Sequence, residues 1–147
     1  MVSLDTNILF YAADKSAGAR HIAAHGLVTA ATGVQAGLTE QSLIEFLNAT
    51  TRKTKLSLDE AAKIVRGYMT WFSLLVPHAA VVEDTLALLE RHRLEIWDAR
   101  LLAVCAAHGC DYLLSEDLQD GAIYGAVQVI DPFAPKNGEL VRELLKQ

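Results

Sequence analysis

Four acidic residues occupy positions where an ordinary solvated charge is not expected. Asp5 and Asp117 each follow a short apolar run, Glu45 lies inside one, and Asp98 comes directly after Trp97. A carboxylate among apolar residues costs free energy unless a cation or hydrogen bonds satisfy it. We therefore treat these four acids as candidates for a functional site.

The chemistry of such a site follows from its atoms. No histidine or cysteine accompanies the four acids at ligand spacing, so the set offers only oxygen. Oxygen ligands suit Mg²⁺ or Mn²⁺ better than zinc. Two such ions about 4 Å apart can hold a phosphodiester, activate a water and stabilise the leaving oxygen. The acids thus favour metal-dependent hydrolysis of a phosphodiester bond.

The overall charge bears on the substrate class. The 147 residues include 13 basic and 18 acidic ones, which gives a formal net charge of −5. A negative balance is unusual for a protein that binds nucleic acid through non-specific phosphate contacts. Two bound dications would bring −5 to −1, so the acidic composition does not exclude a nucleic-acid substrate.

The composition, with 52% hydrophobic residues, predicts one folded domain over residues 1–147. We expect no transmembrane helix, because the long charge-free run 21–38 contains three glycines and several polar residues. The N-terminus lacks the features of a secretory signal, which predicts a cytoplasmic protein. Cys105 and Cys110 match no zinc pattern and are expected to be packed thiols.

The elements that must position the acids alternate between strands and helices. Short apolar runs predict strands at residues 2–4, 112–114 and 127–130. Ser57 and Glu60 form a capping box for a helix that continues to Phe72. Asp98 is expected to open another helix, which ends at Gly109, and residues 140–145 predict a closing helix. This alternation favours an α/β fold with parallel strands, whose ligands bind outside the carboxyl ends of the strands.

The order of these motifs resembles the PIN-domain family, most closely the VapC-like toxins of type II toxin–antitoxin pairs. The resemblance extends over nearly the whole chain. It rests on the segments Leu4-Asp5-Thr6-Asn7-Ile8-Leu9, Glu45-Phe46, Trp97-Asp98-Ala99, Leu114-Ser115-Glu116-Asp117-Leu118-Gln119-Asp120-Gly121 and Val129-Ile130-Asp131-Pro132-Phe133. It implies a three-layer α/β/α sandwich with a short parallel central sheet. The activity implied is a Mg²⁺- or Mn²⁺-dependent endoribonuclease that acts as a toxin, with RNA as substrate, an antitoxin as partner and a homodimer as assembly.

The resemblance also assigns roles to individual residues. By that likeness the metal-binding, catalytic acids are Asp5, Glu45, Asp98 and Asp117. The same likeness places Asn7 close to the first metal and lets Ser115 or Thr6 orient Asp5. It further implies that the helix 58–72 and the first helices form a dimer surface and a groove for an antitoxin segment.

Each of these residues also has a simpler interpretation. Asp5 and Asp98 could serve only as helix caps, Asn7 could satisfy turn backbone groups, and Glu45 could form a structural ion pair with Arg100 or Arg52. In the segment around Asp117, the acids Glu116 and Asp120 are expected to lie in a solvated turn, although either could share the metal-binding role.

Basic and aromatic residues could bind RNA. Arg52, Lys53 and Arg100 are weak candidates for phosphate contacts, since Lys and Arg provide most backbone anchoring. Trp71 and Trp97 could stack on bases, but core or subunit packing is the preferred interpretation. The five histidines are scattered and are expected to be structural or exposed.

Other functions remain open at this point. A haloacid-dehalogenase-type phosphatase needs Asp-x-Asp after its first strand, whereas this chain has Asp5-Thr6-Asn7. A receiver domain needs an acidic pair near its start, which residues 1–4 do not provide. A PIN-fold nuclease acting on DNA or in RNA processing, and a non-catalytic nucleic-acid or protein binding module, are the remaining alternatives.

Overall fold

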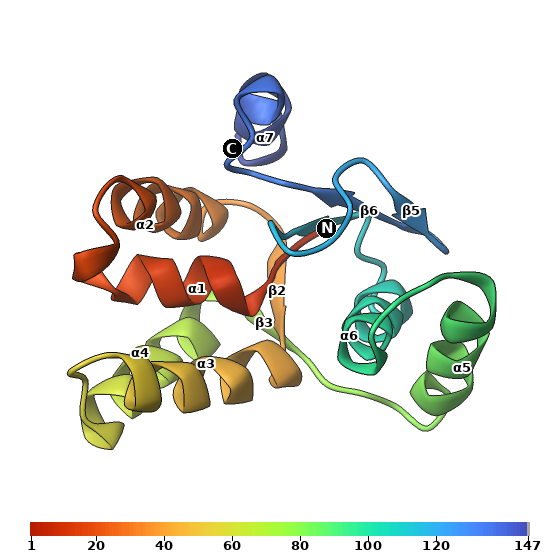
Figure 1. Cartoon of the computed structure of the whole chain (residues 1–147), viewed down its shortest axis with the longest axis horizontal. Coiled ribbons are helices and arrows are strands. Elements are labelled where there is room, and N and C mark those ends of the chain that lie inside the picture. The colour runs from red at the N-terminus through yellow and green to blue at the C-terminus, as the bar shows by residue number, and fades with distance from the viewer. Residues whose placement is uncertain (147) are drawn as a thin grey trace.

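The computed structural model describes residues 1–146 and contains one six-stranded sheet with helices on both faces (Figure 1). The strands are β1 (Val2–Leu4), β2 (Ala36–Thr39), β3 (Ser73–Leu75), β4 (Tyr112–Leu114), β5 (Ile123–Tyr124) and β6 (Val127–Ile130). The helices are α1 (Thr6–Ala13), α2 (Ala19–Ala31), α3 (Glu40–Lys53), α4 (Leu58–Trp71), α5 (Val81–Arg91), α6 (Ile96–Ala107) and α7 (Gly138–Leu144). The three-layer α/β sandwich expected from the sequence is confirmed.

The strand order is β3-β2-β1-β4-β6-β5, and all neighbouring strands are parallel except β5 and β6. The parallel central sheet expected from the sequence is confirmed, and the edge pair β5–β6 adds an antiparallel hairpin. Because only a short turn separates β5 from β6, the two strands can pair only as an antiparallel hairpin. β1 pairs with β2 on one side and with β4 on the other. The order in which the strands follow along the chain therefore changes direction between β1 and β4. Ligands of open α/β sheets bind at such a switch point.

Alternating side chains on the strands contribute to two separate cores. Helices α1–α4 cover one face of the sheet, where Leu4, Leu114 and Ile130 join the first core. Helices α5 and α6 cover the other face, where Leu113 and Val129 join the second (Figure 1). This alternation with a period of two residues is what a strand between two helix layers requires. The central strands are therefore held from both sides, and their carboxyl ends are fixed in position.

Several local signals in the sequence are confirmed. Ser57 and Glu60 form both hydrogen bonds of the capping box at the start of α4. Gly109 has a φ of +71° directly after α6, which is the left-handed conformation expected there. Cys105 and Cys110 are free thiols with exposed fractions of 0% and 2%, as predicted.

Other expectations are wrong. Asp98 does not open its helix: α6 begins at Ile96 and Glu95 is the N-cap residue, so Asp98 lies in the first turn. Trp71 and Trp97 have exposed fractions of 61% and 63%, so packing in the core is wrong for both, whereas the alternative of subunit packing stays a prediction. The apolar residues around Asp98 misled the prediction because Ile96 and Trp97 belong to the helix but face solvent. Within residues 1–146, no helix combines the length and apolar character needed to span a membrane.

Candidate active site

Asp5 lies where β1 ends and α1 begins, at the switch point of the sheet. Its backbone N–H donates to the carbonyl oxygen of Leu114 at the end of β4, at 3.0 Å. The Asp5 side chain caps α1: Oδ1 accepts the backbone N–H of Thr6 at 2.6 Å. Oδ2 accepts the hydroxyl hydrogen of Ser115, also at 2.6 Å. Asp5 is therefore the cap of α1, as one interpretation of the sequence held. The hydrogen bond from Ser115 also joins its side chain to the end of the adjacent strand, β4.

Burial changes the acidity of two of the four acids. Asp5 is 8% exposed, and this desolvation raises its pKa to about 6, against hydrogen bonds from Ser115 and Thr6 that lower it. The negative charges of Asp117 and Glu45 raise the pKa of Asp5 further. Burial also raises the pKa of Asp98, with smaller contributions from Asp117 and Glu45. Each of these two acids is thus close enough to Asp117 and Glu45 to feel their charges.

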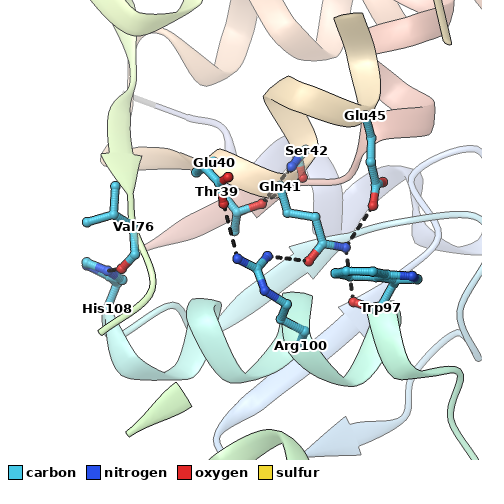
Figure 2. Close-up of polar contacts among 9 residues, drawn as sticks. All are labelled: Thr39, Glu40, Gln41, Ser42, Glu45, Val76, Trp97, Arg100 and His108. Atoms are coloured by element: carbon cyan, nitrogen blue, oxygen red, sulfur yellow. Dashed lines mark hydrogen bonds and ion pairs between the residues drawn. The ribbon is translucent and has the colours of Figure 1, made fainter. Parts of the chain in front are cut away.

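Glu45 is held by neutral hydrogen-bond donors on both of its oxygens. The Thr6 hydroxyl donates to Oε2 at 2.9 Å. The Gln41 side-chain amide donates to Oε1, also at 2.9 Å, as Figure 2 shows. Arg100 does not reach Glu45 but donates to Gln41 at 2.7 Å and to Glu40 at 3.1 Å. Among the ion pairs of residues 1–146, Glu45 has none with Arg100 or Arg52, so the structural ion pair left open by the sequence is not formed.

Asp117 follows β4 and faces the start of α1. Its Oδ2 accepts the side-chain N–H of Asn7 at 3.0 Å, and its backbone N–H donates to the Ser115 hydroxyl at 3.2 Å. Asn7 thereby uses its nitrogen on Asp117, while its buried Oδ1 has no hydrogen-bond partner within residues 1–146. A buried carbonyl oxygen without a donor carries a desolvation cost that a cation would relieve.

The two neighbouring acids of this segment differ from each other. The Glu116 side chain is 15% exposed, pairs with Arg20 at 2.9 Å and lines the same pocket as Asp117, so its placement in a solvated turn is wrong. Asp120 instead pairs with Lys136 at 2.6 Å and accepts hydrogen bonds from the Asp131 backbone and the Asn137 side chain. Asp120 thus holds the C-terminal segment rather than contributing to the pocket.

A pocket of about 330 Å³ collects the predicted acids from four separate parts of the chain. Its lining includes the acids Asp5, Glu45, Asp98, Glu116 and Asp117, together with Thr6, Asn7, Phe10, Tyr11, Ala49 and Lys53. Ser115 lies behind it, fully buried and bonded to Asp5. Arg52 lies in an adjoining hollow that shares Lys53 with the pocket. Arg100 and Trp97 line a third hollow, on the other side of Glu45.

The residues of this pocket fit a hard divalent cation. All the candidate ligands present oxygen, and the partnerless Oδ1 of Asn7 adds a neutral one. Within residues 1–146, no three acidic, histidine or cysteine side chains are grouped tightly enough to bind one ion together. Mg²⁺ typically binds through one or two carboxylates and keeps several of its waters, so this spacing suits it.

Sequence reasoning missed Gln41 as part of the site and preferred a solvated turn for Glu116, although it left open that Glu116 shares the metal-binding role. Gln41 precedes Glu45 by four residues, which places both on one face of a helix, so its spacing was a usable signal. The contact between Gln41 and Arg100 joins residues 59 positions apart and had no local signal. Tyr11 also lines the pocket, and a hydrogen bond to Glu116 raises its pKa.

Comparison with known proteins gives consistent results. The family model described as PIN domain matches residues 2–119. Ribonuclease VapC24 of Mycobacterium tuberculosis is 28% identical over an alignment of 142 positions, which covers 90% of this chain and 97% of that protein. The crystal structure of M. tuberculosis VapC20, described as a sarcin-ricin loop cleaving toxin, is similar in fold, with a TM-score of 0.63 at 19% identity, covering 77% of this chain and 87% of that one.

A toxin–antitoxin complex from Klebsiella pneumoniae contains a chain of the same fold, with a TM-score of 0.62 at 21% identity, covering 86% of this chain and 95% of that one. The residues matched by the family model, 2–119, include Asp5, Glu45, Asp98 and Asp117. The chain belongs to the PIN-domain family.

Proposed function

We propose that this protein is a Mg²⁺- or Mn²⁺-dependent endoribonuclease and the toxin of a toxin–antitoxin pair. The observation that carries the proposal is the convergence of Asp5, Glu45, Asp98 and Asp117 on one pocket. The relative named Ribonuclease VapC24 supports RNA as the substrate. Divalent ions bound at such an all-oxygen site activate water and stabilise charge on phosphodiester oxygens.

The chain's own residues have separable parts in this activity. Asp5, Asp98, Asp117 and Glu45 would hold the ions, and the free amide oxygen of Asn7 is placed to add a ligand. With a pKa of about 6, Asp5 is mostly ionised at pH 7.5, which is the form that binds a cation. We infer that Ser115 and the backbone of Thr6 keep the Asp5 carboxylate in one orientation through their 2.6 Å hydrogen bonds.

The RNA backbone needs positive charge next to this acidic pocket. Lys53 lines the pocket, and the adjoining hollow of about 710 Å³ adds Lys15, Arg52 and Lys55. None of these four side chains has an ion-pair partner within residues 1–146. Unpaired cations beside a catalytic pocket can contact phosphates at low desolvation cost. We infer that the RNA strand leaves the pocket past Lys53 and Arg52.

A cognate antitoxin and a homodimer belong to the same proposal. The apolar hollow between α2 and α4, of about 540 Å³, is lined in part by Trp71, whose side chain is 61% exposed. Exposed apolar surface of this kind marks protein interaction sites. The proposed antitoxin segment would cover it, and the K. pneumoniae neighbour comes from a complex of that type.

Cleavage of total cellular RNA tests the activity. The purified chain is incubated with Mn²⁺ or with EDTA, beside the variant Asp5→Asn and the matched control Asp59→Asn, an exposed acid in the first turn of α4. We expect discrete fragments from the wild type and Asp59→Asn that require Mn²⁺, and none from Asp5→Asn. Intact RNA in every sample, from folded protein free of antitoxin, would contradict the proposal. It would favour a DNA substrate or a binding module.

A further inference from the structure

The side chain of Gln41 is nearly fully buried and completely hydrogen-bonded. It is 7% exposed, on the first turn of α3. Its Nε2 donates to Oε1 of Glu45 at 2.9 Å and to the backbone oxygen of Trp97 at 3.1 Å. Its Oε1 accepts from the Arg100 guanidinium at 2.7 Å (Figure 2). One amide thus joins α3, which carries Glu45, to the first turn of α6, which carries Asp98.

Arg100 helps to fix the orientation of this amide. A guanidinium group only donates hydrogen bonds, so the Gln41 atom that faces it must be the oxygen. If the amide were reversed, its NH₂ group would face the guanidinium donors, and its oxygen would face the Glu45 carboxylate and the Trp97 carbonyl. Each of the three hydrogen bonds would then be lost. The hydrogen bond from Arg100 therefore reinforces the orientation in which Glu45 and the Trp97 carbonyl meet N–H groups.

The arrangement fixes Glu45 without neutralising it. Both donors to its carboxylate, the Thr6 hydroxyl and the Gln41 amide, carry no net charge. The positive charge of Arg100 is directed instead to Glu40, at 3.1 Å. A direct Arg–Glu pair would compete with a metal ion for the same oxygens. The interposed amide leaves the negative charge of Glu45 and its remaining lone pairs available to the pocket.

We propose that Gln41 and Arg100 are positioning residues for Glu45, with Arg100 fixing the amide of Gln41 and Gln41 fixing the carboxylate. The inference rests on the proposed function, in that Glu45 helps to hold the divalent ion. Partners that orient a metal-binding carboxylate typically change metal affinity by roughly 10- to 100-fold when removed. Arg100 would then act on the ion through Gln41 rather than on RNA directly.

Direct measurement of Mn²⁺ binding by calorimetry tests this, with kinetics on a defined RNA as the second readout. We expect Arg100→Met and Gln41→Leu to weaken Mn²⁺ binding about tenfold or more. At saturating Mn²⁺ both variants should lower kcat while the KM for RNA stays unchanged. Arg100→Lys keeps a charged donor for the Gln41 oxygen and should recover part of the Mn²⁺ affinity. Arg93→Met, which removes an exposed arginine between α5 and α6, is the matched control and should bind Mn²⁺ normally.

The outcomes separate this inference from the proposed function. Normal Mn²⁺ affinity in Arg100→Met together with a raised KM would overturn the positioning role and make Arg100 an RNA contact. Absence of Mn²⁺ binding by the wild type would overturn the proposed function, and the positioning role with it. Thermal unfolding establishes that each variant is folded. If Gln41→Leu does not fold, the two substitutions of the partly exposed Arg100 decide the question, and equal Mn²⁺ affinity of Arg100→Met, Arg100→Lys and wild type refutes the inference.

Discussion

The hydroxyl group of Ser115 donates a 2.6 Å hydrogen bond to Oδ2 of Asp5, a residue 110 positions earlier in the chain. Ser115 is fully buried and follows β4, whereas Asp5 follows β1. The bond joins the ends of two parallel neighbours at the point where the strand order reverses. It holds a buried carboxylate in the place where α/β folds bind their ligands.

Removing this hydroxyl group should cost stability. Hydrogen bonds to charged groups contribute about 1.5–3 kcal/mol, so we expect Ser115→Ala to lower the free energy of unfolding by that amount at pH 7.5. Urea denaturation in EDTA measures the change. The control is Ser73→Ala, an exposed serine at the start of β3, which should alter stability by less than about 0.5 kcal/mol. Equal values for the two variants would show that the Ser115–Asp5 bond contributes nothing.

Asp5→Asn should stabilise the metal-free protein at neutral and higher pH. Burial raises the pKa of Asp5 from 3.8 to about 6, so the folded state binds the proton more tightly than the unfolded state. The stability gained from this proton is complete below pH 3.8 and is lost as the pH rises through 6. Above pH 6 the ionised carboxylate costs up to about 3 kcal/mol, which the neutral amide avoids.

The measurement is chemical denaturation of wild type and Asp5→Asn in EDTA at pH 8 and pH 4. The variant should be more stable at pH 8, and the difference should largely disappear at pH 4. A variant that is less stable than wild type at both pH values would contradict the raised pKa. Loss of function with a gain in stability is expected where buried charge serves a site.

The central strands and the acids were predictable because their signals are local. The runs 2–4, 112–114 and 127–130 are strands with those bounds, since each is a short apolar run ended by polar or turn residues. The sequence gives no such signal for β2, whose Ala-Gly start has low strand propensity. Tertiary packing decides there: a Cβ on Gly37 would lie 2.7 Å from the Leu75 side chain, so any larger residue would require Leu75 to shift.

The site was less predictable than the acids that form it. Glu116, Asp117 and Asp120 lie close together in the sequence. Their spacing does not reveal that Glu116 and Asp117 line the pocket while Asp120 faces the C-terminal segment. That separation depends on Lys136 and other residues brought back by the chain beyond β6. Likewise, the largest cause of the raised pKa of Asp5 is burial, which only the packed fold determines.

Binding of Mn²⁺ should release protons at slightly acidic pH. A carboxyl group with a pKa of about 6 is about half protonated at pH 6, and a bound cation displaces that proton. Asp98, whose pKa is also raised, adds to the release. Calorimetry in buffers of different ionisation enthalpy should give at least about half a proton per site at pH 6 and almost none at pH 8. A binding enthalpy independent of the buffer at pH 6 would show that Asp5 is not a ligand.

Asp117 and Asp120 lie three residues apart, and the structure predicts opposite effects for their amide variants. Asp117 is exposed, lines the pocket and accepts one hydrogen bond from Asn7. Asp117→Asn should therefore remove Mn²⁺-dependent cleavage while changing the free energy of unfolding by less than about 0.5 kcal/mol. Asp120 accepts hydrogen bonds from the Asp131 backbone and Asn137 and pairs with Lys136.

Asp120→Asn should lower the free energy of unfolding by roughly 1–2 kcal/mol, because charge-assisted hydrogen bonds are lost while the exposed Lys136 pair adds little. Its cleavage rate per folded molecule should equal that of wild type. RNA cleavage and urea denaturation of the two variants, measured side by side, separate the roles. Cleavage must be lost in the variant whose carboxylate holds the ion. If Asp120→Asn abolished cleavage and Asp117→Asn did not, Asp120 rather than Asp117 would be the acid after β4 that serves the pocket.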